Sequence, residues 1–99
     1  MLNITKEQQG KKTVIALEGR LDTNTASQLE GEIEGIGSDV AELEIDMTAL
    51  EYISSAGLRV LLLAHKKMSK QGEMTVSHAS EAVMEILDVT GFADILEVK

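Results

Sequence analysis

Residues 41–70 read AELEIDMTALEYISSAGLRVLLLAHKKMSK, and this stretch joins a strand pattern to a helix pattern. In residues 41–47 apolar and acidic side chains alternate, so the predicted strand has one apolar face and one acidic face. Residues 55–70 repeat leucine and methionine at helical spacing. Between the two elements, Leu50, Tyr52 and Ile53 are expected to fasten a loop. A strand with one solvent-exposed face, followed by an amphipathic helix, indicates a sheet that helices cover on one face.

The segment before residue 41 predicts two further strands and a helix. Residues 2–5 alternate and residues 13–17 form a short apolar run, with a polar turn that contains glycine between them, so the two are expected to pair as a hairpin. The apolar run suits a strand that is buried on both faces. Thr25 and Gln28 have the spacing of a capping box, and apolar side chains then recur every three or four residues up to Ile36.

The segment after residue 70 predicts a fourth strand at residues 74–76 and a third helix that begins after Ser80. A short apolar tail at residues 95–98 is able to dock on the core. Strands that alternate with helices favour parallel pairing, and right-handed crossovers that keep one direction across a sheet place their helices on one face. We therefore predict a single α/β domain over residues 1–99. It has two layers, a mixed sheet of about four strands and helices mainly on one face, in the order β-β-α-β-α-β-α.

Composition excludes several classes of protein. Cysteine is absent, which rules out disulfides, thiol catalysis and thiolate metal sites. The 17 acids against nine bases give a net charge of -8, and aromatic residues make up only 2% of the chain, which argues against nucleic acid as a partner. No apolar run is long enough for a membrane span or a signal peptide, so no membrane association is expected and we expect a cytoplasmic protein.

Functional groups of open α/β sheets gather where parallel strands end and the next helices begin. Residues 20–25 and 46–55 are predicted to reach that edge, which would put Asp22 and Asp46 along it. The second segment ends in Ser54 and Ser55, directly ahead of the longest helix. One interpretation is that a serine caps this helix by accepting a backbone N–H bond. The other is that a serine is phosphorylated, because a helix N-terminus tolerates a dianion.

The run ISSAGLRVLL at residues 53–62, with LEIDM at residues 43–47 and GRLD at residues 19–22, resembles the STAS-domain anti-sigma-factor antagonists of bacteria. The resemblance covers essentially the whole chain, because length and element order agree as well. It implies a STAS-like fold and a partner switch. The unphosphorylated antagonist binds an anti-sigma factor with serine kinase activity and so frees the sigma factor. That anti-sigma factor or a related serine kinase phosphorylates the antagonist from ATP and so releases it, and a metal-dependent serine phosphatase reverses the modification.

Matched residue by residue, the resemblance puts the phosphorylated serine at Ser55, with Ser54 in reserve. Ser54 stands where many members have an aspartate, and Ala56 stands where many have a second hydroxyl. Asp22 matches an acid implicated in the family's partner contacts, and Asp46 matches the acid that ends the third strand. The expected partner-binding residues are Asp22, Thr23, Asn24, Ser54, Ser55, Ala56, Gly57 and Leu58.

Other functions find less support in the sequence. A Ser-His-Asp hydrolase is not expected, since His65 lies about 15 Å along the helix from Ser55 and no G-x-S-x-G elbow exists. Residues 22–33 lack the glycine and the terminal glutamate of a calcium loop. We expect no enzymatic activity, no cofactor and no metal, and a monomer when the protein is free. The competing role implied by the family is that of a STAS subunit in a lipid-transport ATPase complex, bound structurally and not switched by a kinase.

Overall fold

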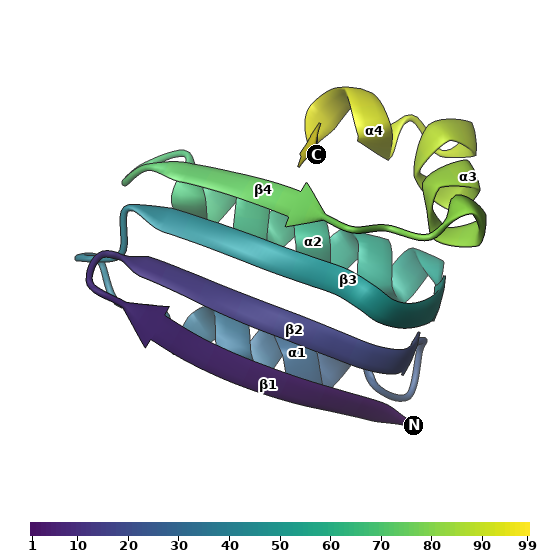
Figure 1. Ribbon diagram of the computed structural model, residues 1–99, viewed down its shortest axis with the longest axis horizontal. Coiled ribbons are helices and arrows are strands. Elements are labelled where there is room, and N and C mark those ends of the chain that lie inside the picture. Colours follow the sequence, from purple (N-terminus) through teal and green to yellow (C-terminus); the bar gives the residue numbers. More distant parts are fainter.

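A mixed sheet of five strands forms the frame of the protein, whose structure is a computed structural model that describes residues 1–99 (Figure 1). The strands lie in chain order; β1 runs antiparallel to β2, and the other neighbours are parallel. Their bounds are β1 Leu2–Gln9, β2 Lys12–Leu21, β3 Glu42–Ile53, β4 Glu73–Ser77 and β5 Glu97–Val98. The predicted hairpin is confirmed, and Gly10 in its turn adopts φ +62°.

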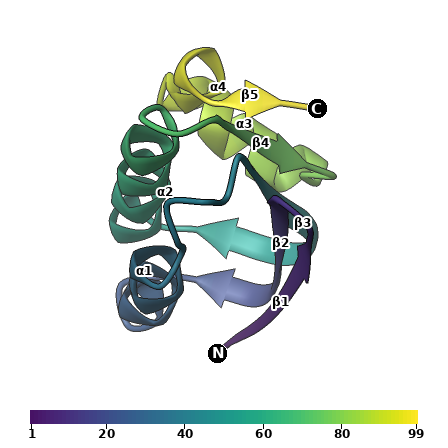
Figure 2. The ribbon, with the colours of Figure 1, turned by 90° about the vertical axis from the view of Figure 1, so that its left-hand side faces the viewer.

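Two helices, α1 (Ala26–Glu34) and α2 (Ser55–Met68), cover one face of the sheet. Figure 2 views the sheet end-on, along its strands, and places both helices on the same side of it. Each helix links two parallel strands, and right-handed crossovers that step the same way deliver their helices to one face. The predicted two-layer α/β arrangement is therefore confirmed.

The core lies between the covered face of the sheet and the helices, as one cluster of 24 buried residues. Within residues 13–17 of β2, Ile15 and Leu17 are at most 1% exposed, whereas Val14 and Ala16 on the other face are only half-buried. The prediction that this run is buried on both faces is wrong, because α1 and α2 cover only one of them.

β3 is longer than predicted and runs through the expected loop. It spans Glu42–Ile53, so Leu50 and Tyr52 belong to the strand. In two places β3 contributes one residue more than β2, which marks two bulges. Across them the buried side chains are Met47, Leu50 and Ile53, spaced by three residues instead of two. The strict alternation that predicts a strand ends at the first bulge, which is why the sequence pattern stopped at residue 47.

The C-terminal segment closes one end of the molecule with α3 (Glu81–Val89) and α4 (Phe92–Ile95). The Ser80 hydroxyl accepts the Val83 N–H at 3.3 Å, so the predicted start of the third helix is confirmed. Leu96 is 3% exposed and β5 pairs with β4, so the apolar tail docks on the core. None of the helices combines the length and the apolar content that a bilayer span needs.

Candidate functional site

The ends of β2 and β3 bring two loops together at one edge of the sheet. Leu21 pairs with Ile53, and the Leu21 carbonyl accepts the Ser54 N–H at 2.8 Å. The chain then turns into α1 after residues 22–25 and into α2 at Ser55. Asp22 follows Leu21, and Ser54 follows Ile53. Because Leu21 and Ile53 are paired, the two predicted loops meet at this edge, and together they form the candidate site.

Ser54 and Ser55 occupy different positions at the start of α2. Ser54 is the N-cap residue, with extended backbone (φ -90°, ψ 173°), and its Oγ accepts the Gly57 N–H at 3.3 Å. Ser55 is the first residue of the helix; its side chain is exposed, and its hydroxyl has no hydrogen-bond partner in the chain. Capping, one of the two predicted roles for a serine here, thus belongs to Ser54 and leaves the Ser55 hydroxyl free.

The first turn of α2 suits an added negative charge. It contains no acidic side chain, and the unpaired N–H groups of a helix start carry a partial positive charge. Ala56, the next residue, is half-buried and carries only a methyl side chain. An anion attached to the Ser55 oxygen would face helix N–H groups and not a carboxylate of the same turn.

Gly57 and Leu58 support this turn from beneath. A Cβ on Gly57 would lie 2.6 Å from Cγ of Leu21, so only glycine lets α2 approach the end of β2 this closely. Leu58 is 5% exposed and belongs to the core. Both residues were predicted to bind a partner, and the structure buries both. The surface that a partner can reach at this turn is made by the other residues.

The loop after β2 is organised by Asp22 and Thr25. The Thr25 hydroxyl accepts the Asp22 N–H and donates to the Arg20 carbonyl, each at 2.9 Å. The Asp22 carboxylate accepts the N–H groups of Asn24 and Thr25 at 3.0 and 3.1 Å, which is an Asx turn. Thr23 and Asn24 are exposed at the tip of this loop.

The predicted capping box between Thr25 and Gln28 is wrong. Thr25 is the N-cap residue of α1, but its side chain makes no capping bond, because its backbone is helical (φ -107°, ψ -10°). A capping side chain needs an extended backbone to reach the first free N–H groups of the helix. Thr25 instead ties the loop to β2, and the residue is buried, with 8% of its surface exposed.

The same hydrogen bonds set the charge of Asp22. Partial desolvation favours its neutral form, but the hydrogen bonds from Thr25 and Asn24 together outweigh it and hold the pKa of the Asp22 carboxyl below its ordinary value. Asp22 therefore carries a fixed negative charge at the edge of the candidate site at neutral pH.

Asp46 does not lie at this edge, contrary to the prediction. Because β3 continues to Ile53, Asp46 sits in mid-strand, opposite Ala16 of β2 and Ser77 of β4. Its Oδ1 accepts the hydroxyl and the N–H of Thr48 at 2.6 and 3.0 Å. These bonds lower the pKa of the Asp46 carboxyl, with a smaller contribution from His78. Asp46 thus fixes a bulge on the open face of the sheet.

Two side chains near the candidate site were missed in the sequence. The Arg20 guanidinium lies over the Tyr52 ring, 4.5 Å from its centroid. The two residues face each other because the second bulge sets Arg20 opposite Tyr52. No spacing rule could pair them without that bulge. Together they form an aromatic and cationic corner between the ends of β2 and β3.

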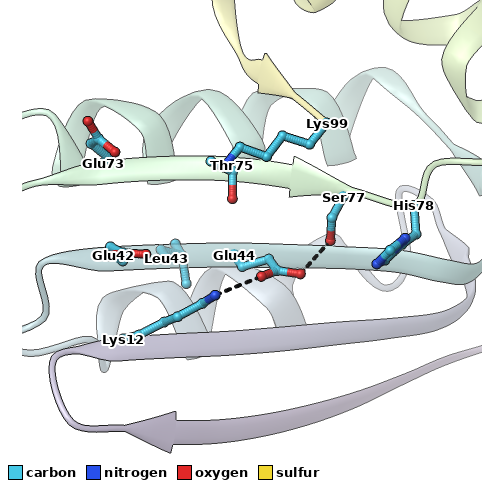
Figure 3. A pocket seen from close by; sticks show the side chains of 9 residues that line it. All are labelled: Lys12, Glu42, Leu43, Glu44, Glu73, Thr75, Ser77, His78 and Lys99. Carbon is cyan, nitrogen blue, oxygen red and sulfur yellow. Dashed lines mark hydrogen bonds and ion pairs between the residues drawn. The ribbon is translucent and has the colours of Figure 1, made fainter.

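The open face of the sheet carries a hydrogen-bonded network that links three strands (Figure 3). Glu44 of β3 accepts the Ser77 hydroxyl at 2.6 Å and pairs with the Lys12 ammonium at 3.1 Å. The Ser77 bond and then the Lys12 contact lower the pKa of the Glu44 carboxyl. The network joins β2, β3 and β4, and it lies in a hollow of about 240 Å³. No group of three or more histidines and acids is placed to hold a metal.

The similarity to known proteins extends over nearly the whole chain. Residues 4–97 match the family model described as "Mlab, STAS domain". A candidate anti-sigma factor antagonist of Bordetella bronchiseptica, BtrV, is 31% identical over 99 residues, which cover 98% of this chain and 85% of that protein.

Two solved structures share the fold. The anti-sigma factor antagonist from Mycobacterium paratuberculosis superposes with a TM-score of 0.89 at 25% identity, over 99% of this chain and 85% of that one. The Bacillus cell fate determinant SpoIIAA in its phosphorylated form superposes with a TM-score of 0.75 at 17% identity, over 98% of this chain and 91% of that one, which shows a common fold.

Proposed function

Because the chain belongs to the STAS-domain family, we propose that it acts as an anti-sigma-factor antagonist in a bacterial partner switch. The unphosphorylated form binds and sequesters an anti-sigma factor that has serine kinase activity. Phosphorylation of Ser55 from ATP releases that partner, and a metal-dependent serine phosphatase restores the binding form. The free protein is a monomer in the cytoplasm, and it is not itself an enzyme. The observation that carries the proposal is the free, exposed Ser55 hydroxyl at the start of α2.

Charge is the proposed basis of the switch. A phosphoryl group adds about -1.5 to -2 charges and three acceptor oxygens. In the free protein the N–H groups of α2 and the surrounding water stabilise this charge. In a complex, the same group has to be desolvated against a partner surface that fits a neutral serine, and it lies on the same edge as the Asp22 carboxylate. Phosphorylation therefore favours the free protein.

Ser55 is the better candidate for modification than Ser54. The Ser54 Oγ already accepts the Gly57 N–H and its side chain is half-buried, whereas the Ser55 hydroxyl is free and exposed. A kinase that modified Ser54 would have to reach a half-buried oxygen that already accepts a backbone N–H. This difference supports Ser55 as the site and keeps Ser54 as the reserve.

The proposed partner surface spans both loops of the site. Its accessible residues are Asp22, Thr23, Asn24, Ser54, Ser55 and Ala56. Gly57 and Leu58 contribute from below by holding the turn in place. Asp22 supplies a fixed negative charge, so a basic side chain of the partner is expected to face it.

Mass spectrometry tests the phosphorylation site. The protein is incubated with ATP and the anti-sigma factor kinase from the same genome, and the intact mass is measured. The wild type and Ser54→Ala are expected to gain one phosphoryl group, and Ser55→Ala none. Labelling that persists in Ser55→Ala but disappears in Ser54→Ala would move the site to Ser54. An unmodified chain that purifies from its own cells with a permease and an ATPase would favour the lipid-transport role instead.

A further inference from the structure

Helix α3 exposes two side-chain stripes that the proposed switch does not use. Residues three or four positions apart share a helix face, so a nine-residue helix presents each stripe as a continuous ridge. The buried stripe packs on the core through Val83 and Leu87. Next to it runs an apolar exposed stripe, and next to that an acidic one. The apolar stripe consists of Ala82, Ile86 and Val89, and the acidic stripe of Glu81, Glu85 and Asp88.

The apolar stripe has no cover in this chain. Val89 is 80% exposed, more than any other large apolar side chain except the terminal Met1. Ile86 is half-buried and packs against the core, so the stripe continues the core surface outward. A groove of about 300 Å³ runs along it, lined by Ala82, Glu85, Ile86, Val89 and Thr90. An apolar groove that begins at the core and is flanked by charge has the form of a helix-docking site.

Charge selects the occupant of this groove. Residues 80–98 contain five acids and no lysine or arginine, so this segment holds more than half of the net charge of -8. The acids of α3 lie on one side of the groove, and Glu85 lines it directly. A second copy of the chain would bring like charges together across a twofold axis. A partner with lysine or arginine beside its apolar side chains would match both stripes.

We propose that α3 is a docking surface for a basic amphipathic helix of a partner protein. The apolar face of that helix fills the groove beside Ile86 and Val89, and its basic face lies against Glu81, Glu85 and Asp88. The proposal does not depend on phosphorylation of Ser55. Figure 1 places α3 at the end of the sheet where β2 and β3 finish, which is also where α2 begins. One partner could therefore contact both places.

A pair of synthetic peptides tests this surface. One is a helix of leucine and lysine of about four turns, and its twin carries glutamate in place of lysine. Each is titrated into the full chain while backbone amide shifts are followed by NMR. The basic peptide is expected to shift the amides of α3 in a saturable way, and the acidic peptide is expected to shift none. Shifts that spread over the open face of the sheet, or a self-association of the chain without peptide, would overturn the proposal.

Matched variants separate docking from general attraction. Val89→Ser removes the exposed apolar side chain, and Glu85→Gln with Asp88→Asn removes two charges beside the groove. Each change is expected to raise the Kd of the basic peptide for the chain by about tenfold. Glu30→Gln with Glu34→Gln removes the same charge from α1 and is expected to change the affinity by less than about twofold. An equal loss in both double variants would mean that net charge alone attracts the peptide.

Discussion

Ser54 and Ser55 are neighbours in the chain, but their hydroxyl groups are expected to contribute differently to stability. Ser54→Ala removes the bond to the Gly57 N–H and should lower the free energy of unfolding by about 1 kcal/mol. Ser55→Ala removes a hydroxyl without a partner and should change it by less than about 0.5 kcal/mol. Urea unfolding of both variants measures the difference. A larger loss for Ser55→Ala would contradict the assignment of the cap to Ser54.

The carboxylates with lowered pKa predict how the protein responds to acid. The pKa of Glu44 is lower in the folded chain than its ordinary value of 4.5, so its charged form stabilises the fold above that value. This stabilisation is present at neutral pH and is lost as the pH falls below about 4.5 and through the lowered pKa. Asp22 and Asp46 act in the same direction. Thermal unfolding between about pH 7 and pH 3 should therefore show a fall in stability on the acid side.

Glu44→Gln removes the contribution of Glu44 to this loss of stability in acid. The variant should lose less stability than the wild type as the pH falls, so the acid limb of its stability curve should be flatter. At neutral pH its free energy of unfolding should fall by less than about 1 kcal/mol, because the partner Lys12 is partly exposed. Glu42→Gln is the control, since Glu42 makes no ion pair or side-chain hydrogen bond and lies on the same strand. An acid limb that is equally steep in Glu44→Gln and in the wild type would show that this network does not titrate as described.

At the scale of the elements, two glycines in helices test where close packing matters. Gly57→Ala would put a Cβ 2.6 Å from Leu21 and should destabilise the protein by about 1–3 kcal/mol. Gly31→Ala in α1 would meet nothing within 4 Å and should stabilise it by up to about 1 kcal/mol, since alanine favours a helix. Thermal unfolding of the two variants checks the opposite signs. A stabilised Gly57→Ala protein would mean that α2 does not need its close approach to β2.

The elements also show what sequence patterns can predict here. The helix that follows Ser54 and the one that follows Ser80 could be predicted, because spacing and capping residues agree in both. The full length of β3 could not, because two bulges replace a spacing of two with a spacing of three. The position of Asp46 in mid-strand could not be predicted for the same reason. A bulge depends on the neighbouring strand, so the local pattern does not contain it.

The loop after β2 shows the same limit at the candidate site. Its place beside Ser54 could be predicted from the order of strands and helices. The role of Thr25 could not, because the spacing of a capping box is shared by a threonine that bonds backward to β2. The Arg20–Tyr52 contact likewise depends on a bulged register. Local spacing locates the site, whereas the pairing of the two strands determines its contacts.

At the scale of the whole molecule, the proposed functional surfaces gather at one end. The loop after β2, the start of α2 and helix α3 all lie where β2 and β3 finish, as Figure 1 shows. The opposite end holds the last turn of α2, with its basic residues His65, Lys66 and Lys67. A partner that binds the proposed surfaces therefore meets Asp22 and the three acids of α3, with Arg20 as a cation beside them. We expect its contact surface to be basic, and its association to slow as salt screens these charges.

The affinity of the anti-sigma factor kinase for two forms of this chain tests the central claim most directly. One form is unmodified and the other carries a single phosphoryl group on Ser55; isothermal titration calorimetry gives a Kd for each. We predict that the unmodified protein binds and that the phosphorylated protein binds at least about a hundredfold more weakly, since like charges and a desolvated phosphate both oppose the complex. Equal affinity of the two forms, within about twofold, would contradict the switch.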